Sequence, residues 1–352
     1  MKYLLKFLIL LFGTLSFSQE LIFENLFDSS LNSEIACYRI PSIVTSTNGI
    51  LIAAIDERNN TCGDLKWNRN INIVLRKSYD DGKTWTKIER IIDYPIGESA
   101  SDPSMIVDRQ TKDIFLFYNY MNLDKAKDIY RFMVIKSNDN GESWSSPKDI
   151  TDQITKKEWK NDFMFITSGR GIQSEDGILL HCLVNLNKGT HIFGSNDHGK
   201  NWFLIDYPLK PGDESKIIEL SNGDWLVNSR VNSNKFRYSH ISKDKGKSWL
   251  SFENKDLSDP ACNASIINYN ISSEKLLLFS NAFDSNERKN LSLSISYDQG
   301  MSWKNNKTIY KGSSAYSSMT KLKNGDVGLF FEKDNYTKNV FVRVPKKWVL
   351  DK

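Results

Sequence analysis

The stretch Ser78-Tyr-Asp80-Asp-Gly82-Lys-Thr-Trp85 decides the fold, because its pattern Ser-x-Asp-x-Gly-x-x-Trp occurs five times along the chain. We call this pattern the box. In it, Asp can accept hydrogen bonds from backbone amides ahead of it, Gly can adopt positive φ, and Ser can brace the chain reversal. Each box therefore predicts a tight hairpin turn, and we expect its Trp to pack back against its own hairpin. The other four boxes span residues 137–144, 195–202, 242–249 and 296–303.

Extended runs lie before the boxes. Leu291–Ile295 and Ile71–Leu75 show the alternation of a half-buried strand, so each box is expected to join two antiparallel strands, the third and fourth of a unit. A second repeat, in which a turn is followed at once by an apolar strand, lies upstream of every box and occurs once more near the end of the chain. Its six turns are Asn48-Gly49, Lys112-Asp113, Asp176-Gly177, Asn222-Gly223, Glu274-Lys275 and Asn324-Gly325.

Six four-stranded units, closed into a ring by pairing of the terminal strands, predict an all-β fold: a six-bladed β-propeller. The last unit has no box and is completed by Asn339–Val344. A β-sandwich or two stacked β domains are the alternatives, but neither accounts for a repeat of about 50 residues. We therefore expect one propeller domain, with very little helix.

Composition and charge agree with a folded globular chain. The 352 residues are 39% hydrophobic and 26% charged, with 47 Lys and Arg against 43 Asp and Glu, a formal net charge of +4. No basic tract concentrates the positive charge, so nothing in the sequence favours a nucleic-acid partner.

The N-terminal segment, residues 1–18, has the pattern of a secretory signal peptide. Lys2 and Lys6 flank the apolar run Leu4–Phe12, and the small-residue pattern Ser16-Phe17-Ser18 follows. A membrane anchor is the rival interpretation, but the run is shorter than the ~20 residues of a spanning helix. We predict cleavage after Ser18, a single domain over 19–352 with no integral membrane segment, and export to the periplasm, the exterior or the cell surface.

The four cysteines and four histidines do not form a metal-binding pattern. No Cys-x-x-Cys or paired-His spacing is present. Cys37 and Cys62 could form one bridge, but we expect isolated buried thiols at these positions and at Cys182 and Cys262. No cofactor is predicted.

Charged residues follow several of the apolar strands. If the box lies at the end of strand three, the end of strand two lies on the opposite face, because the two strands are antiparallel. Residues there include Arg58, Arg230, Arg288 and Glu332. One arginine on a loop is usually a solvated surface residue, but several at equivalent positions predict an anion-binding face, because guanidinium binds a carboxylate or phosphate with two hydrogen bonds.

The boxes together with Tyr38-Arg39-Ile40-Pro41 resemble the bacterial sialidase (neuraminidase) family, from about Tyr38 to Glu332. The boxes alone are weakly specific, because propellers that are not enzymes also contain them. The resemblance implies that Arg39, Arg230 and Arg288 form a triad that binds the carboxylate of a sialic acid.

The same resemblance assigns supporting residues. Arg58 is similar to a further arginine of the pocket, and Asp102 in Ser101-Asp102-Pro103-Ser104 matches an aspartate that contacts the substrate. Glu332, which follows Tyr316 at the spacing found in the family, matches the carboxylate that holds Arg39.

Three residues match the catalytic positions of the family. Asp64 in Cys62-Gly63-Asp64 falls where the family has its acid/base, and Glu214, upstream of Arg230, falls where it has its base glutamate. Tyr316 matches the nucleophile. A tyrosine avoids the repulsion that a carboxylate nucleophile would meet at an anomeric carbon bearing a carboxylate.

The resemblance implies a retaining exo-α-sialidase that acts on sialylated glycans without a cofactor, and we expect a monomer. An intramolecular trans-sialidase, or an enzyme that prefers a deaminated sialic acid, is the alternative within the same class. A non-catalytic glycan-binding propeller is the alternative from another class; it would retain the arginines, but loss of Tyr316, Glu214 or Asp64 would favour it, and all three are present.

Overall fold

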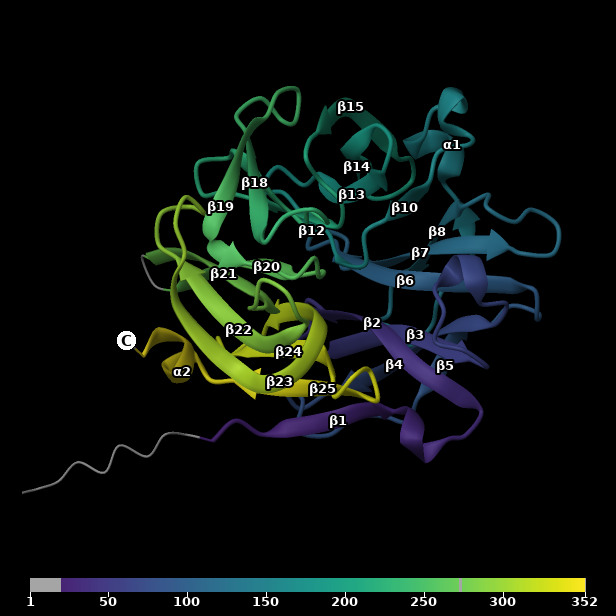
Figure 1. Ribbon diagram of the computed structural model, residues 1–352, viewed down its shortest axis with the longest axis horizontal. Helices are drawn as coiled ribbons and strands as arrows, with labels where there is room; N and C mark the ends of the chain where they lie inside the picture. The colour runs from purple at the N-terminus through teal and green to yellow at the C-terminus, as the bar shows by residue number, and fades with distance from the viewer. Residues whose placement is uncertain (1–19, 272–273, 352) are drawn as a thin grey trace, which may run out of the picture.

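The computed structural model describes residues 20–271 and 274–351, which form sheets arranged around a central axis (Figure 1). All strand pairs among these residues are antiparallel except β11 with β6. Helix in these residues is limited to α1 (Thr151–Ile154), α2 (Lys346–Leu350) and the 3-10 turns η1 (Ser29–Leu31), η2 (Leu65–Trp67) and η3 (Lys157–Trp159). The all-β, propeller-like fold predicted from the sequence is confirmed. The expected signal peptide lies outside the described residues.

Four of the sheets have four or five strands. Their hydrogen-bonded orders are β2-β3-β4-β5, β11-β6-β7-β8-β9, β10-β13-β14-β15 with β12 also on β13, and β16-β17-β18-β19. The strands are β2 (Ile35–Thr45), β3 (Leu51–Asn59), β4 (Ile71–Ser78), β5 (Glu89–Ile92), β6 (Glu98–Val107), β7 (Ile114–Asn122), β8 (Arg131–Ser137), β9 (Lys148–Asp149), β10 (Met164–Ile166), β11 (Gly169–Arg170), β12 (Ile172–Gln173), β13 (Leu179–Asn185), β14 (Gly189–Ser195), β15 (Phe203–Leu209), β16 (Ser215–Glu219), β17 (Trp225–Ser229), β18 (Phe236–Ser242) and β19 (Leu250–Ser258).

The fifth sheet among the described residues has seven strands in the order β1-β25-β24-β23-β22-β21-β20. Its strands are β1 (Phe23–Asp28), β20 (Ser265–Ile271), β21 (Glu274–Ala282), β22 (Lys289–Ser296), β23 (Lys304–Lys321), β24 (Val327–Lys333) and β25 (Lys338–Val344). The predicted pairing of the terminal strands is present, because β1 pairs antiparallel with β25.

The strand pairing gives five sheets where the sequence predicted six separate units. The reason is β23, an 18-residue strand that pairs with β22 up to Ser313 and with β24 from Ser314 onward. The blade count therefore depends on whether β23 is counted as one strand or two.

The boxes form turns of the predicted kind between the third and fourth strands. In the first box, Asp80 Oδ1 accepts hydrogen bonds from the backbone amides of Lys83 and Thr84 at 3.1 and 2.9 Å, and Ser78 Oγ accepts one from the amide of Gly82 at 2.8 Å. The residue before each box glycine and the glycine itself both have positive φ, at 60° and 85° for Asp81 and Gly82.

The boxes also pack against the preceding sheet, a contact that the expected packing of each Trp on its own hairpin does not include. The indole of Trp85 donates to its own hairpin at Gly82, but its ring lies 5.1 Å from that of Phe341 on β25. A Cβ on Gly82 would lie 2.2 Å from the same Phe341 ring, so a larger residue cannot replace this glycine. The boxes thus contribute packing contacts between neighbouring sheets.

Asp80→Ala is expected to lower the free energy of unfolding by about 1–2 kcal/mol, because charged hydrogen bonds to backbone amides at a turn are lost. Urea denaturation of the two proteins measures the difference. Lys83→Ala, which changes an exposed side chain of the same turn, should leave the midpoint unchanged. An Asp80→Ala protein as stable as its parent would contradict a stabilising role for the box.

Cys37 and Cys62 form a disulfide, with their Cα atoms 5.6 Å apart. The expectation of free thiols at these two positions is therefore wrong. The sequence could not show that the chain folds back after β3 and brings Cys62 beside β2. Cys182 and Cys262 are free and buried, as expected.

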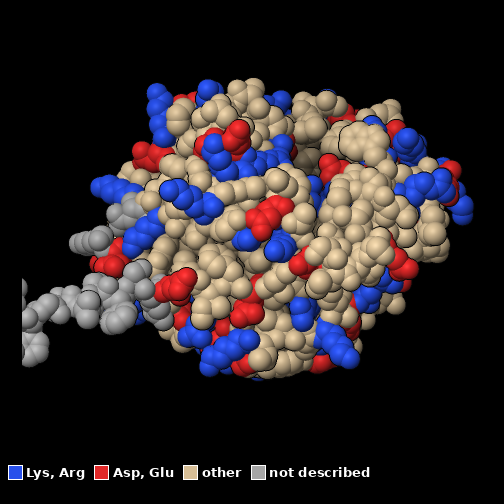
Figure 2. Space-filling view, turned by 60° about the horizontal axis from the view of Figure 1, so that its bottom comes forward, with Lys and Arg blue, Asp and Glu red and all other residues tan. Residues whose placement is uncertain are grey.

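Over residues 20–271 and 274–351, no helix has the length and apolar character needed to cross a bilayer. On the face shown in Figure 2, Lys and Arg side chains lie interspersed with Asp and Glu.

Candidate active site

Eight of the nine predicted site residues line one cavity of about 290 Å³. The ninth, Glu332, lies directly behind Arg39. Arg58 pairs across the sheet with Ile71, whereas Ser78 of the first box pairs with Leu51, so the cavity and the boxes lie at opposite ends of β4, as predicted. The eight lining residues are Arg39, Arg58, Asp64, Asp102, Glu214, Arg230, Arg288 and Tyr316.

A larger cavity of about 550 Å³ opens elsewhere and is lined by Arg109, Arg170 and Glu219, among others. None of the predicted site residues lines it. The smaller cavity is therefore the candidate active site, because it brings together the groups that can carry out chemistry.

Tyr316 and Glu214 form a hydrogen-bonded pair at the base of the cavity. The Tyr316 hydroxyl donates to Glu214 Oε2 at 2.7 Å, and Arg230 Nη1 donates to the same oxygen at 2.6 Å and to the hydroxyl at 3.2 Å. Burial and the charge of Glu214 raise the pKa of Tyr316 well above its ordinary value, although Arg230 and Arg288 oppose the rise. The phenol is therefore protonated at neutral pH, with a carboxylate placed to accept its proton.

Hairpin geometry explains why Glu214 and Arg230 meet. Ser215 at the start of β16 pairs with Ser229 at the end of β17, so the next residues outward are cross-strand neighbours. The backbone amide of Arg230 donates to the carbonyl of Glu214 at 3.0 Å. The sequence spacing between Glu214 and Arg230 is thus set by the length of one hairpin.

Glu332 connects the arginine on β2 with the tyrosine on β23. Its carboxylate is fully buried and accepts hydrogen bonds from Arg39 Nε at 2.6 Å, from the Ile40 amide at 2.9 Å and from the Tyr316 amide at 3.1 Å. Within the described residues, the terminal nitrogens of Arg39 make no hydrogen bond. The guanidinium is thereby held through Nε beside the cavity, and its terminal nitrogens remain available as donors.

Register shifts in three strands turn side chains toward the cavity. The β2–β3 pairing shifts between Arg39 and Ser42, the β6–β7 pairing between Ser101 and Ser104, and the β23–β24 pairing between Ser314 and Ser317. Ile40 has φ of 69° and Asp102 of 64°, which are unusual for residues other than glycine. Such bulges redirect side chains, and these three lie beside Arg39, Asp102 and Tyr316.

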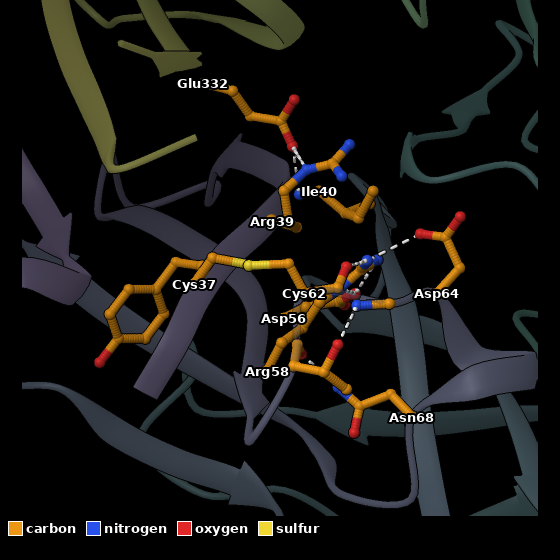
Figure 3. The surroundings of a disulfide bond; sticks show 12 residues. Cys37, Arg39, Ile40, Asp56, Arg58, Cys62, Asp64, Asn68 and Glu332 are labelled. Carbon is orange, nitrogen blue, oxygen red and sulfur yellow. Dashed lines mark hydrogen bonds and ion pairs between the residues drawn. A yellow bond between two sulfur atoms is a disulfide. The ribbon is translucent and has the colours of Figure 1, made fainter. Parts of the chain in front are cut away.

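Arg58 connects Asp56 with Asp64 (Figure 3). It donates to Asp56 Oδ2 at 3.0 Å through Nη2, and to Asp64 Oδ1 at 2.7 Å and the Cys62 carbonyl at 2.9 Å through Nη1. Partial burial raises the pKa of Asp64, but the Arg58 charge and hydrogen bond outweigh it and hold that pKa below its ordinary value. The charges of Arg39 and Arg288 lower the pKa of Asp64 further, so a bound carboxylate that neutralises these two arginines would lessen the lowering.

Burial and the charge of Asp56 raise the pKa of Asp102 above its ordinary value. Asn119 Nδ2 donates to Asp102 Oδ2 at 2.9 Å, and the Asp102 amide donates to Asp56 Oδ1 at 3.0 Å. Four arginines, Arg39, Arg58, Arg230 and Arg288, line the cavity, and their charges favour an anionic ligand.

The structure adds residues that the sequence did not indicate. The ring of Tyr336 lies 4.0 Å from the Arg39 guanidinium, and its hydroxyl accepts from Arg288 Nη1 at 3.3 Å. Asp213 lies beside Glu214 and accepts a hydrogen bond from Asn232, which also accepts one from Arg230. The adjacent acids Asp213-Glu214 could have been noted as a pair, whereas no sequence signal marks Tyr336. One wall is apolar, formed by Leu65, Tyr130, Phe163, Phe165 and Leu186.

The sequence from residue 61 to residue 329 matches the family model of BNR repeat-like domains. A sialidase of Bacteroides fragilis is 29% identical over 330 residues, covering 84% of this chain and 60% of that protein. A sialidase of Micromonospora viridifaciens is 32% identical over 327 residues, covering 84% of this chain and 50% of that protein. The chain thus spans between half and 60% of the length of these two relatives.

Two solved structures have the same fold. The Hadza microbial sialidase Hz136 superposes with a TM-score of 0.80 at 26% identity, over 90% of this chain and 67% of that chain. The intramolecular trans-sialidase from Ruminococcus gnavus superposes with a TM-score of 0.82 at 19% identity, over 93% of this chain and 98% of that chain, which shows a shared fold.

Proposed function

Within the BNR repeat-like domain family, to which the chain belongs, we propose that it is an exo-α-sialidase, a glycoside hydrolase that removes terminal α-linked sialic acid from glycoconjugates. The observation that carries the proposal is the Tyr316–Glu214 hydrogen bond inside a cavity lined by arginines. The nucleophile is already hydrogen-bonded to its base, and arginines beside it can donate hydrogen bonds to a carboxylate. This arrangement fits a substrate whose reacting carbon bears a carboxylate.

Arg39, Arg230 and Arg288 are proposed to bind the sialic acid carboxylate. They come from β2, the end of β17 and the loop before β22, and all three line the cavity. Glu332 holds Arg39 and Tyr336 contacts Arg288, so two of the arginines are oriented before the ligand arrives. Such preorganisation reduces the entropy lost on binding.

In the proposed first step, the Tyr316 oxygen attacks the anomeric carbon as the glycosidic bond breaks. The phenolic proton passes to Glu214, and Asp64 donates a proton to the departing oxygen. Because the pKa of Tyr316 is raised, the phenolate forms only as the base accepts the proton.

In the proposed second step, water attacks the same carbon and the bond to the tyrosine oxygen breaks. Asp64, now a carboxylate, accepts the proton of the water, and Glu214 returns its proton to Tyr316. Two inversions give net retention, and both steps use only side chains that line the cavity.

Turnover of a fluorogenic aryl α-sialoside by the purified protein tests the proposal. Release of the fluorophore supports an enzyme. Binding of sialosides without release would favour a non-catalytic glycan-binding propeller and would contradict the proposal.

The first product is expected to be the α anomer of free sialic acid, because a covalent intermediate requires two inversions. Proton NMR within the first minutes of reaction, before mutarotation, measures the anomer. Initial β anomer would contradict Tyr316 as nucleophile. A bicyclic anhydro product would retain Tyr316 as nucleophile and identify an intramolecular trans-sialidase.

We also propose that the propeller has six blades, with the first half of β23 closing one and the second half opening the next. The change of partner at Ser313 and Ser314 supports this count.

Export as a monomer after cleavage near Ser18 is proposed as well. The disulfide supports export, because disulfides persist in oxidising compartments. Mass spectrometry of the secreted protein tests cleavage, and light scattering tests the oligomeric state.

A further inference from the structure

We propose that the Cys37–Cys62 disulfide positions Asp64 for proton transfer, which makes Cys37 and Cys62 positioning residues of the reaction. The inference rests on the proposed function, because it takes Asp64 to be the acid/base. It adds a role for two residues outside the group that contacts substrate.

The bridge joins the two segments that carry the carboxylate-binding arginine and the acid. Cys37 lies two residues before Arg39 on β2, and Cys62 lies two residues before Asp64 in the loop that follows β3. In Figure 3 the bridge runs from β2 to this loop, and the Arg58 guanidinium lies between the loop and Asp56. One covalent bond therefore relates the position of the acid to that of the bound carboxylate.

The loop that carries Asp64 has few other attachments. No residue from Asn60 to Asp64 is buried, and the Asp64 side chain is 67% exposed. The loop is held by Arg58, whose side chain is buried, through the Cys62 carbonyl and Asp64, and by Asn68, whose Nδ2 donates to the Thr61 carbonyl at 2.7 Å. The Asp64 carbonyl also accepts a hydrogen bond from the Trp67 amide at 2.8 Å, and the buried Leu65 follows Asp64 directly. Within the described residues the disulfide is the one covalent cross-link between this loop and β2, so its loss would leave the loop held by noncovalent contacts alone.

The other reacting groups do not depend on this tether. Tyr316 and Glu214 are buried and are held by one another, by Arg230 and by Glu332. Loosening residues 60–64 should therefore displace the proton donor and leave the nucleophile and its base in place. Proton transfer requires donor and acceptor within hydrogen-bond reach, so a small displacement reduces the rate of this step selectively.

The disulfide also stabilises the fold, because it closes a loop with a sequence separation of 25 residues. A stabilising role alone would lower the activity on every substrate in proportion to the folded fraction. A positioning role depends on how much the leaving group needs the proton. The two roles are therefore separated by comparing leaving groups.

The test compares the wild type, a Cys37→Ser/Cys62→Ser double variant and Asp64→Ala on two substrates. One is an aryl α-sialoside with an acidic phenol, which scarcely needs protonation, and the other is sialyllactose, whose sugar leaving group does. We expect the double variant to lose about 10- to 100-fold in kcat on sialyllactose and less than about 3-fold on the aryl sialoside. Asp64→Ala should show the same discrimination, larger in size.

Binding of an unsaturated, planar-ring sialic acid analogue to the double variant should remain within about twofold of wild type, because the arginines are unchanged. If the double variant does not fold, reduction of the folded wild-type protein with dithiothreitol provides the second measurement. Reduction should reproduce the selective loss of kcat on sialyllactose, and reoxidation should restore it.

Equal losses on both substrates, or no loss on sialyllactose, would overturn the positioning role while leaving the proposed function intact. A wild-type protein that cleaves neither substrate would overturn the proposed function, and the inference with it. Equal losses for Asp64→Ala on both substrates would remove Asp64 as the acid, and the inference would fall for that reason instead.

Discussion

Tyr316→Phe is expected to reduce kcat by several orders of magnitude while the affinity for free sialic acid or the unsaturated analogue changes little. The substitution removes the nucleophilic oxygen but retains the ring, whose centroid lies 5.6 Å from the Arg39 guanidinium and 5.4 Å from that of Arg288. The arginines therefore keep their packing. Binding without turnover is the expected signature, and single-turnover kinetics with calorimetry measures the two separately.

Tyr79→Phe is the matched control for this prediction. It removes a hydroxyl from an exposed tyrosine in the first box, at the opposite end of the sheet from the cavity, and should leave kcat unchanged. Near-normal turnover by Tyr316→Phe would show that another group attacks the substrate. A parallel loss of analogue binding would show that the hydroxyl serves recognition instead.

The repeats made the local architecture predictable because each carries its own turn chemistry. The five boxes and five of the six turn-strand repeats placed their turns correctly, since Asp, Gly and Ser act on backbone groups within a few residues. The sixth, Glu274-Lys275, is wrong as a turn, because both residues belong to β21. The spacing of the site residues follows from the same hairpins: Glu214 and Arg230 continue the pairing of β16 with β17, and Tyr316 and Glu332 that of β23 with β24.

What the sequence did not indicate depends on contacts between distant segments. The shift between Arg39 and Ser42, which turns Arg39 toward the cavity, depends on Glu332, 292 positions from Ile40, whose carboxylate accepts the Ile40 amide. Tyr336 reaches Arg39 and Arg288 from a turn with no motif. The sequence likewise did not indicate that β23 runs without a break from one hairpin into the next. The repeat predicts the separate units, but it does not predict how the strands of neighbouring units are connected.

The sequence allowed the disulfide but did not favour it, for a related reason. Two cysteines with a sequence separation of 25 can be distant or adjacent in space, and only the return of the chain after β3 places them together. Asp64 was located from the family resemblance, but its exposure and its single hydrogen bond to Arg58 are structural results. They explain why the position of this acid depends on its loop.

Arg39→Ala is expected to weaken binding of free sialic acid by ~2–5 kcal/mol, roughly 30-fold to several thousandfold, because one partner of a partly desolvated arginine–carboxylate pair is removed. The ground state and the transition state both carry the carboxylate, so KM should rise more than kcat falls. Calorimetry and steady-state kinetics measure the two effects. Arg131→Ala, which removes an exposed arginine paired at 3.7 Å with Asp149, should bind normally.

Part of the loss of affinity in Arg39→Ala would come from destabilisation of the protein itself, because Glu332 would be left buried without its charged partner. Arg39→Lys separates the two contributions: it retains a positive charge near Glu332 but loses the planar fork that binds a carboxylate with two hydrogen bonds. We expect Arg39→Lys to unfold at nearly the wild-type temperature and still to bind sialic acid at least about tenfold more weakly. If Arg39→Lys bound as tightly as wild type, Arg39 would act on the ligand as a charge alone. If Arg39→Ala also bound normally, the carboxylate would have to be held by Arg230 and Arg288 without it.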